Sequence, residues 1–312
     1  MFSFHYLNDA PILDVGEHPA LEGNVNGPSL IAAPEWLVDP PGKYLLYFAH
    51  HEGRSIRLAA SDDLAGPWKI ITPPPLDLER SLFASTPPAD SELHPEARQY
   101  IEAGADGNYP HIASPDVWVD HETEQIRLYY HGRLEDGRQR SRVALSRDGL
   151  NFAARMETIG SPYFRIFCHD GWFYALAMPG QLYRSTDGLG NFEAGPRLTT
   201  EAIRHHALLQ QDDQWFVLWT RVGDSPERIL LSMLHTPDDW QQWGFAETIE
   251  IHRAQKTWEG ADITPRASQY GAIMERANEL RDPAIFVEDG KIYLLYSIAG
   301  EQGIGIGELR KL

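Results

Sequence analysis

Short apolar and aromatic runs recur along the chain in a fixed order. Each unit has an apolar strand, a turn, an aromatic-rich second strand, a third strand, and a Ser- or Asp-containing turn before Trp or Phe. Segments with helical periodicity are scarce. An internal repeat of this kind indicates the architecture of a chain more directly than any single element does. The five copies occupy residues 28–70, 114–152, 163–192, 204–240 and 282–309.

The starts of the units are about 40 to 85 residues apart. A period near 40 to 50 residues with four strands per unit is typical of propeller blades, which cover each other's faces and leave only short edges. The wider spacings come from a Pro-rich insertion at 72–108 and a segment at 254–280. A β-sandwich is the alternative fold, but it would not require the same three-strand sequence pattern five times. We therefore predict an all-β protein, a single five-bladed β-propeller domain over 1–312. Its blades are expected at 24–71, 109–160, 161–198, 203–253 and 279–312, and residues 2–7 should supply the missing outer strand of the last blade.

Composition and charge limit the classes of function and partner that fit this chain. The 9 Trp, 13 Tyr, 12 Phe, 26 Gly and 22 Pro suit short strands and tight turns. A net charge of -18 opposes binding to nucleic acid or to an anionic membrane. With one cysteine, Cys168, no intrachain disulfide and no cysteine-based zinc site can form. No leader or membrane span is visible, so we expect a cytoplasmic protein; its oligomeric state is left open.

Candidate chemistry lies where the inner strands begin and the second strands end, because in a propeller these places converge on one mouth. Histidine and arginine are costly to bury without partners, so a group of them indicates a ligand or water. For any single histidine, tying two blades together is the alternative role. The residues at these positions are Asn26, Ser29, His50, His51, His111, Asp116, His131, Arg133, Arg165, Arg204, His205, His206, Arg221, Glu279, Arg281 and Asp282.

The phrases SPDVWVD, IRLYYHG and SRVALSRDGLNF of the second copy, with RDPAIFVEDGKIYLLYS of the last, resemble five-bladed propeller glycoside hydrolases related to arabinanases, xylosidases and anhydrogalactosidases. This resemblance implies an Asp in the first blade that activates water, an Asp in the second that tunes the acid, and a Glu, or in one branch a His, that protonates the leaving group. Asp116 matches the second. Asn26 and Ser29 stand where the first is expected, and Arg165 stands where the acid is expected.

This departure leaves three interpretations open. In the first, the missing carboxylates come from Asp282, Glu279 or Glu259, at the separation of about 6.5 to 9.5 Å that inverting hydrolysis needs. In the second, the acid is a histidine beside a carboxylate, and the candidates are His50, His51, His111 and His205. In the third, catalysis has been lost or replaced. We predict a glycoside hydrolase with Asp116, Asp282, His111 and Glu279 as catalytic residues. The substrate-binding residues would be Asn26, Ser29, His50, His51, His131, Arg165, Arg204, His205, His206, Arg221 and Arg281.

The expected partner is a short oligosaccharide or glycoside. The arginines suit an acidic sugar, unless they neutralise neighbouring Asp and Glu residues. We expect no cofactor and assign no metal ligand, although a single divalent cation on the axis would fit the resemblance. Two other functions remain: a non-catalytic carbohydrate-binding propeller, and a polysaccharide lyase acting on a uronate-containing sugar.

Overall fold

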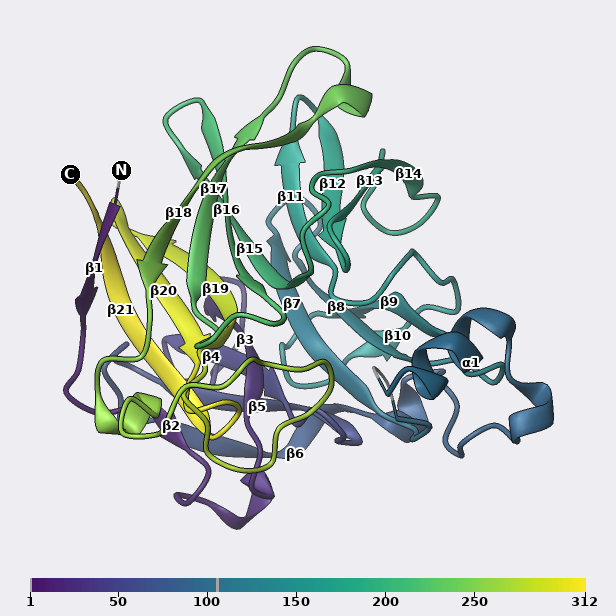
Figure 1. Ribbon diagram of the computed structural model, residues 1–312, viewed down its shortest axis with the longest axis horizontal. Helices are drawn as coiled ribbons and strands as arrows, with labels where there is room; N and C mark the ends of the chain where they lie inside the picture. The colour runs from purple at the N-terminus through teal and green to yellow at the C-terminus, as the bar shows by residue number, and fades with distance from the viewer. Residues whose placement is uncertain (1, 105–106) are drawn as a thin grey trace.

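The computed structural model describes residues 2–104 and 107–312, and within them the strands form five antiparallel sheets arranged around one axis (Figure 1). The predicted five-bladed β-propeller is confirmed. Blade I contains β3 (Asn26–Ala32), β4 (Tyr44–Ala49), β5 (Ser55–Ser61) and β6 (Lys69–Asp77), and blade II contains β7 (Ile112–Asp120), β8 (Gln125–Arg133), β9 (Gln139–Ser146) and β10 (Ala153–Ala154). Blade III contains β11 (Arg165–His169), β12 (Trp172–Ala177), β13 (Gln181–Ser185) and β14 (Glu193–Arg197), and blade IV contains β15 (Ile203–Gln211), β16 (Gln214–Arg221), β17 (Ile229–His235) and β18 (Gly244–His252).

Blade V joins the two ends of the chain. Its inner strands are β19 (Arg281–Glu288), β20 (Lys291–Ser297) and β21 (Gly303–Lys311), and β1 (Phe2–Tyr6) adds antiparallel to β21 as the outer strand. The short β2 (Leu13–Asp14) pairs with the other end of β21. Both termini therefore lie together at the edge of this blade (Figure 1), and the ring closes through the strand pairing expected from the incomplete fifth copy.

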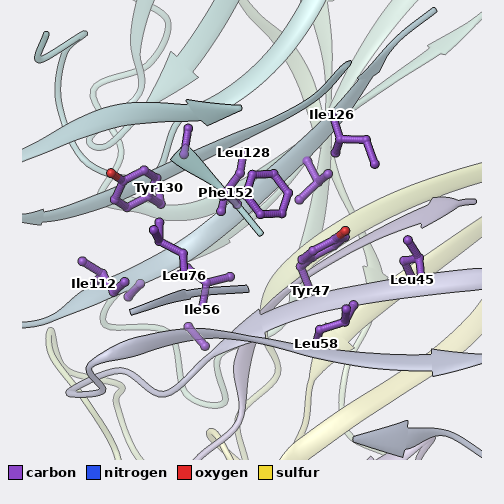
Figure 2. Packing of buried hydrophobic residues seen from close by; sticks show 14 of the residues in the cluster. Leu45, Tyr47, Ile56, Leu58, Leu76, Ile112, Ile126, Leu128, Tyr130 and Phe152 are labelled. Atoms are coloured by element: carbon purple, nitrogen blue, oxygen red, sulfur yellow. The ribbon is translucent and has the colours of Figure 1, made fainter. Parts of the chain in front are cut away.

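Apolar side chains of neighbouring blades pack together between the sheets. Figure 2 shows the cluster between blades I and II, where Tyr47 and Leu58 face Leu128 and Phe152. The Tyr47 hydroxyl donates a 2.8 Å hydrogen bond to the carbonyl oxygen of Gly149 in the Ser-Asp-Gly turn of the next blade. That turn has a structural role, because a tight β-turn needs Asp and Gly there.

Blade I was expected to end at residue 71, but its outer strand extends into the predicted insertion. Strand β6 continues to Asp77 through three prolines, which an outermost strand tolerates because one of its edges needs no backbone donors. The rest of the insertion carries the helix α1 (Pro95–Glu102). Short 3-10 helices lie at Pro19–Leu21, Leu78–Arg80, Asp90–Glu92, Trp240–Gln242 and Thr257–Glu259. Among the described residues, no helix is both long and apolar enough to cross a membrane.

The closing strand predicts a stability effect that can be measured. Phe2 is buried and packs edge-on against Phe216 of blade IV, with ring centroids 5.4 Å apart. We expect Phe2→Ala to lower the free energy of unfolding in urea by about 2 to 3 kcal/mol, the value of burying one large apolar side chain. Leu7→Ala, just past β1 at a more exposed position, should cost less than about 0.5 kcal/mol. Equal losses in the two variants would show that β1 does not lock the ring.

Candidate active site

The inner strands are bent at the end that faces the mouth. In β3, β7, β15 and β19 the register with the second strand shifts within the first five residues, as in a β-bulge. Bulges of this kind re-aim side chains and are common beside active sites. Left-handed backbone accompanies them at Gly27 (φ 61°), Ser114 (φ 51°) and Asp282 (φ 47°), and Tyr163 (φ 65°) precedes β11 in the same conformation. Non-glycine residues held this way carry strain that the surrounding structure must support.

Five aromatic rings form a wall across the mouth, which we call the ring wall. Successive ring centroids are 5.0 Å apart between Tyr109 and His111, 5.5 Å between His111 and His131, 4.7 Å between His131 and Tyr163, and 4.9 Å between Tyr163 and His205. The wall runs from blade II past the start of blade III to blade IV. The expected convergence of His111, His131 and His205 is therefore present, and Tyr163, which the sequence analysis overlooked, lies between the last two.

Burial keeps His131 neutral. Desolvation lowers the pKa of this buried imidazole well below its ordinary value, and neighbouring His111, His51 and His205 lower it further. Its Nδ1 atom is buried and makes no hydrogen bond within the part of the chain that the structure describes. A buried nitrogen without a partner costs free energy unless a ligand or water supplies one. This atom is thus a polar group of the ring wall whose hydrogen-bonding capacity is unused by the described residues.

His205 and Asp282 hold each other. The Asp282 backbone N–H donates to His205 Nδ1 at 3.3 Å, so Nε2 carries the proton and donates to Asp282 Oδ1 at 3.0 Å. Ser297 donates to the other carboxylate oxygen at 2.9 Å. Burial would raise the pKa of Asp282, but His205 and Ser297 outweigh it and hold that pKa below its ordinary value. With both oxygens occupied inside the protein, these contacts favour a positioning role for Asp282.

His51 has a different environment. Its Nδ1 donates to Oε1 of Glu301 at 2.9 Å, and its side chain keeps 12% of its surface exposed, whereas the Glu301 side chain is fully buried. Arg281 and Asn24 also donate to this carboxylate, at 2.9 and 2.7 Å. His51 Nε2 makes no hydrogen bond to the described residues. The result is an imidazole oriented by a buried carboxylate with its second nitrogen unused, which is the arrangement of a proton-transfer histidine.

Glu301 is the main residue that sequence reasoning missed. Burial would raise its pKa, but the charges of His51 and Arg281 and the hydrogen bonds of His51 and Asn24 hold it far below its ordinary value. Glu301 follows β20 by four residues, in the turn before β21. His51 is the second residue after β4, whereas Glu301 is the fourth residue after β20, so a rule that considers only the residues next to the strand end finds His51 and misses Glu301.

The remaining arginines of the mouth are neutralised by carboxylates or held by carbonyl oxygens. Arg281 donates twice to Glu279, at 2.6 and 2.9 Å, and Arg204 lies 3.6 Å from the buried carboxylate of Glu227. Glu279, predicted as catalytic, is therefore bound by a guanidinium through one carboxylate oxygen. Arg221 is paired at the periphery with Asp224 and Glu201. The sequence analysis weighed neutralisation as the alternative to binding an acidic sugar, and these contacts favour it.

Asp116 faces a different space. It lines an axial cavity of about 160 Å3 between the middles of the inner strands, together with Ser29 and Arg165. Ile166 N–H donates to its carboxylate at 2.7 Å, and Arg165 lies at 3.6 Å. Burial raises the pKa of Asp116, although Arg165 and the Ile166 amide oppose this. Since Arg165 also donates to the Pro115 and His206 carbonyl oxygens, it joins three inner strands.

Two other predicted residues, Ser29 and His206, hold blades together, whereas within the described chain His50 and Asn26 do not. Ser29 Oγ accepts a hydrogen bond from Val117 N–H in the next blade at 2.8 Å. His206 Nε2 donates to the Leu176 carbonyl oxygen at 2.8 Å, and burial lowers the pKa of His206 to about 3. His50 Nδ1 accepts from Glu52 N–H, within the turn after β4. Asn26 is buried with its Oδ1 unpartnered among the described residues.

Glu259 lies outside the mouth, where its carboxylate accepts hydrogen bonds from Tyr6, Tyr296 and His252. It anchors the segment at 261–278, which we call the strap and which lies between β18 and β19 (Figure 1). Three blades hold the strap by its carbonyl oxygens: Arg204 donates to Gln269, Arg281 to Gly271 and Asn24 to Ile273. The strap thus covers part of the mouth.

Two cavities lie along the strap. One of about 370 Å3 is lined by strap residues with Glu279 and Arg281. The other, of about 310 Å3, lies between α1, blade II and blade III. Tyr270 of the strap lines both. Across residues 2–104 and 107–312, no group of three His, Cys, Asp or Glu side chains is arranged to hold a metal ion.

Comparison with solved structures defines the class of fold. CoXyl43, a GH43 β-xylosidase/α-arabinofuranosidase from a compost microbial metagenome in complex with xylotriose, has a TM-score of 0.60 at 13% identity, covering 100% of this chain and 96% of that chain. The GH43_1 enzyme from Xanthomonas citri complexed with xylotriose has a TM-score of 0.59 at 11% identity, covering 93% and 88%. The chain therefore has the fold of the five-bladed propeller glycoside hydrolases, as the resemblance of its strand sequences indicated.

Sequence comparison places the chain within a family. It belongs to the same family as the uncharacterized protein R118 of Acanthamoeba polyphaga mimivirus, to which it is 33% identical over 314 residues, covering 92% of this chain and 84% of that protein. No family model matches the chain.

Proposed function

We propose that the protein hydrolyses a glycosidic bond of a short saccharide bound at the mouth, with His51 as the group that transfers the proton. The observation that supports this most is the His51–Glu301 pair, in which a partly exposed imidazole is oriented by a fully buried carboxylate. Relatives in fold that were crystallised with xylotriose support a saccharide ligand. Glycosidic cleavage needs an acid at the leaving oxygen and an acceptor for the proton of the attacking water.

His51 and His131 suit these two tasks. Nδ1 of His51 donates to the carboxylate of Glu301, which orients the ring, and we assign its Nε2 as the atom that gives a proton to the glycosidic oxygen. His131 is neutral, and its Nδ1 is unpartnered among the described residues, so we assign it as the acceptor of the water proton. Acid–base catalysis requires one group that gives a proton and another that accepts one. Tyr163, beside His131, would present its ring and hydroxyl to the sugar.

A non-catalytic sugar-binding propeller is the second candidate. It is favoured by the contacts of Asp282 and Glu279, whose carboxylates are held within the protein by His205, Ser297 and Arg281. In that case the ring wall and His51 would bind hydroxyl groups without proton transfer.

A product analysis separates the candidates. The protein is incubated with xylotriose and with 4-nitrophenyl glycosides of several pentoses and hexoses, and the products are followed by chromatography and near-ultraviolet absorbance. We expect a new reducing end with no unsaturated chromophore. An unsaturated product from a uronate-containing oligosaccharide would instead identify a lyase. Binding in calorimetry without cleavage of any ligand would overturn the hydrolase in favour of a sugar-binding protein.

A further inference from the structure

A second cavity, outside the ring wall, is lined by three arginines and two exposed tyrosines. We call this cavity of about 310 Å3 the arginine groove. It is formed by α1, the start of β9, the residues before β11, the β12–β13 turn, the end of β14 and the strap. Its volume falls in the range of small-molecule sites, about 300 to 1,000 Å3. The residues that matter most are Arg138, Arg140, Arg197, Tyr100 and Tyr270.

The three guanidinium groups are not equally neutralised. Arg140 forms two 2.8 Å hydrogen bonds to Glu96, and Arg138 pairs with Asp136 at 2.7 Å. Arg197 donates only to carbonyl oxygens, from Nε to Pro179 at 2.8 Å and from Nη2 to Glu201 at 3.3 Å. No carboxylate within the described ranges pairs with it. These carbonyls hold the guanidinium in place, and the groove keeps three cations against two carboxylates.

This local excess of positive charge runs against the rest of the molecule. With 27 Lys and Arg against 45 Asp and Glu, the protein as a whole repels anions. A guanidinium without a carboxylate is suited to bidentate binding of a carboxylate or a sulfate. The tyrosines add flat, apolar surface: Tyr100 is 47% exposed and Tyr270 is 39% exposed. Sugar rings stack on such surfaces, because their C–H faces are apolar.

The groove adjoins the proposed catalytic centre. Ser161 and Pro162, which line it, directly precede Tyr163 of the ring wall, and Met178, which also lines it, follows the last residue of β12. Tyr270 separates the groove from the cavity that reaches Arg281. A saccharide that has one sugar at the ring wall would pass Tyr270 and place another sugar in the groove.

We infer that the arginine groove is a subsite for an anionic sugar unit, whose carboxylate or sulfate is bound by Arg197 while its ring lies against Tyr100 and Tyr270. This inference rests on the proposed function in that it makes the substrate an acidic oligosaccharide. It also attributes the preference for an acidic sugar to a different arginine from those in the mouth. Each mouth arginine that suggested it in the sequence has a protein carboxylate within ion-pair distance, although Nε and Nη1 of Arg204 make no hydrogen bond to the described residues. Arg197, in contrast, is not paired with an acid in the described chain.

The test compares ligands that differ only in charge. Calorimetric titration uses the protein with His51→Gln, so that the ligand stays intact, and three branched xylotrioses whose branch is glucuronic acid, glucose or 6-O-sulfoglucose. We expect at least one acidic branch to bind about tenfold more tightly than glucose, which is the value of one charged hydrogen-bonded contact at a partly exposed site. The tighter of the two acidic ligands identifies carboxylate or sulfate as the natural group.

Variants locate the effect. Arg197→Gln should remove the preference for the acidic branch and leave the affinity for the glucose branch unchanged, and Tyr100→Ala should weaken all three ligands. Arg310→Gln removes the same charge from an exposed arginine on β21 and should change nothing. Equal binding of acidic and neutral ligands, or a preference that survives Arg197→Gln, would overturn the subsite. If acidic and neutral ligands bind equally but the unmodified protein cleaves neutral xylotriose, the subsite is overturned and the proposed function stands. If binding of the acidic ligand depends on Arg197 but no ligand is cleaved, the hydrolase is overturned and the subsite stands.

Discussion

His51→Gln should lower kcat on any cleaved glycoside by about 10² to 10⁴-fold, the usual contribution of one general acid or base. Glutamine can still donate a hydrogen bond to Glu301 and fill a similar volume, but it cannot give up a proton at the position of Nε2. The effect should appear in kcat with little change in KM, because the proton moves only in the transition state. Initial rates over a range of substrate concentrations measure both parameters.

The neighbouring histidine provides a matched control. His50→Gln makes the same chemical change one residue earlier, where the ring accepts a hydrogen bond from Glu52 N–H inside a turn. This variant should keep kcat within about threefold of the original protein. If both variants keep full activity, His51 is not the proton donor; if both lose it equally, the loss reflects the turn after β4 and not the chemistry of His51.

Glu301→Gln should lower the free energy of unfolding by about 3 to 5 kcal/mol at pH 7, the cost of breaking a buried ion pair from one side. The carboxylate is fully buried and receives hydrogen bonds from His51, Arg281 and Asn24. Substitution would leave Arg281 with less compensating charge and His51 without its anionic partner. Urea unfolding followed by tryptophan fluorescence measures this loss, and the activity should fall together with it.

The same carboxylate predicts a dependence on pH. Its pKa in the folded protein is depressed from the ordinary value of 4.5. It therefore contributes its full stabilisation above about pH 4.5, and the contribution is lost as the pH falls and the unfolded chain takes up protons first. The original protein should lose stability through this acidic range, and Glu301→Gln should lose less of it.

An exposed ion pair provides the comparison for this experiment. Glu79 bonds to Arg54 at 2.6 Å, but its side chain is 63% exposed. Glu79→Gln should cost less than about 1 kcal/mol, because solvent screens a surface pair. An acid response in Glu301→Gln as steep as in the original protein would contradict the assigned role of Glu301.

The blade pattern was readable from the sequence because a strand's preference is local. Alternating apolar residues and turn signals set where strands such as β4 and β8 begin and end, and the incomplete fifth copy pointed to β1 as the closing strand. The convergence of histidines was also predictable, since equivalent positions of a propeller meet at the axis. His131 and His205 lie in the ring wall for this reason.

Partners of these residues could not be predicted, because partnership depends on the path of turns and long segments. Asp282 and Glu279 were predicted as catalytic carboxylates, yet each is held by a basic neighbour. Glu301 became important because the turn between β20 and β21 brings it to His51, 250 residues earlier in the chain. In the sequence, the strap was visible only as part of a segment that lengthens the spacing between the fourth and fifth copies.

What the chain alone determined is the set of strands and the face on which its polar residues gather, since both follow from short-range patterning repeated five times. What only the tertiary structure decided is which of those residues are free to act. A charged side chain is neutralised or available according to a neighbour a few ångströms away, and such neighbours here come from different blades. Local sequence carries no information about that distance.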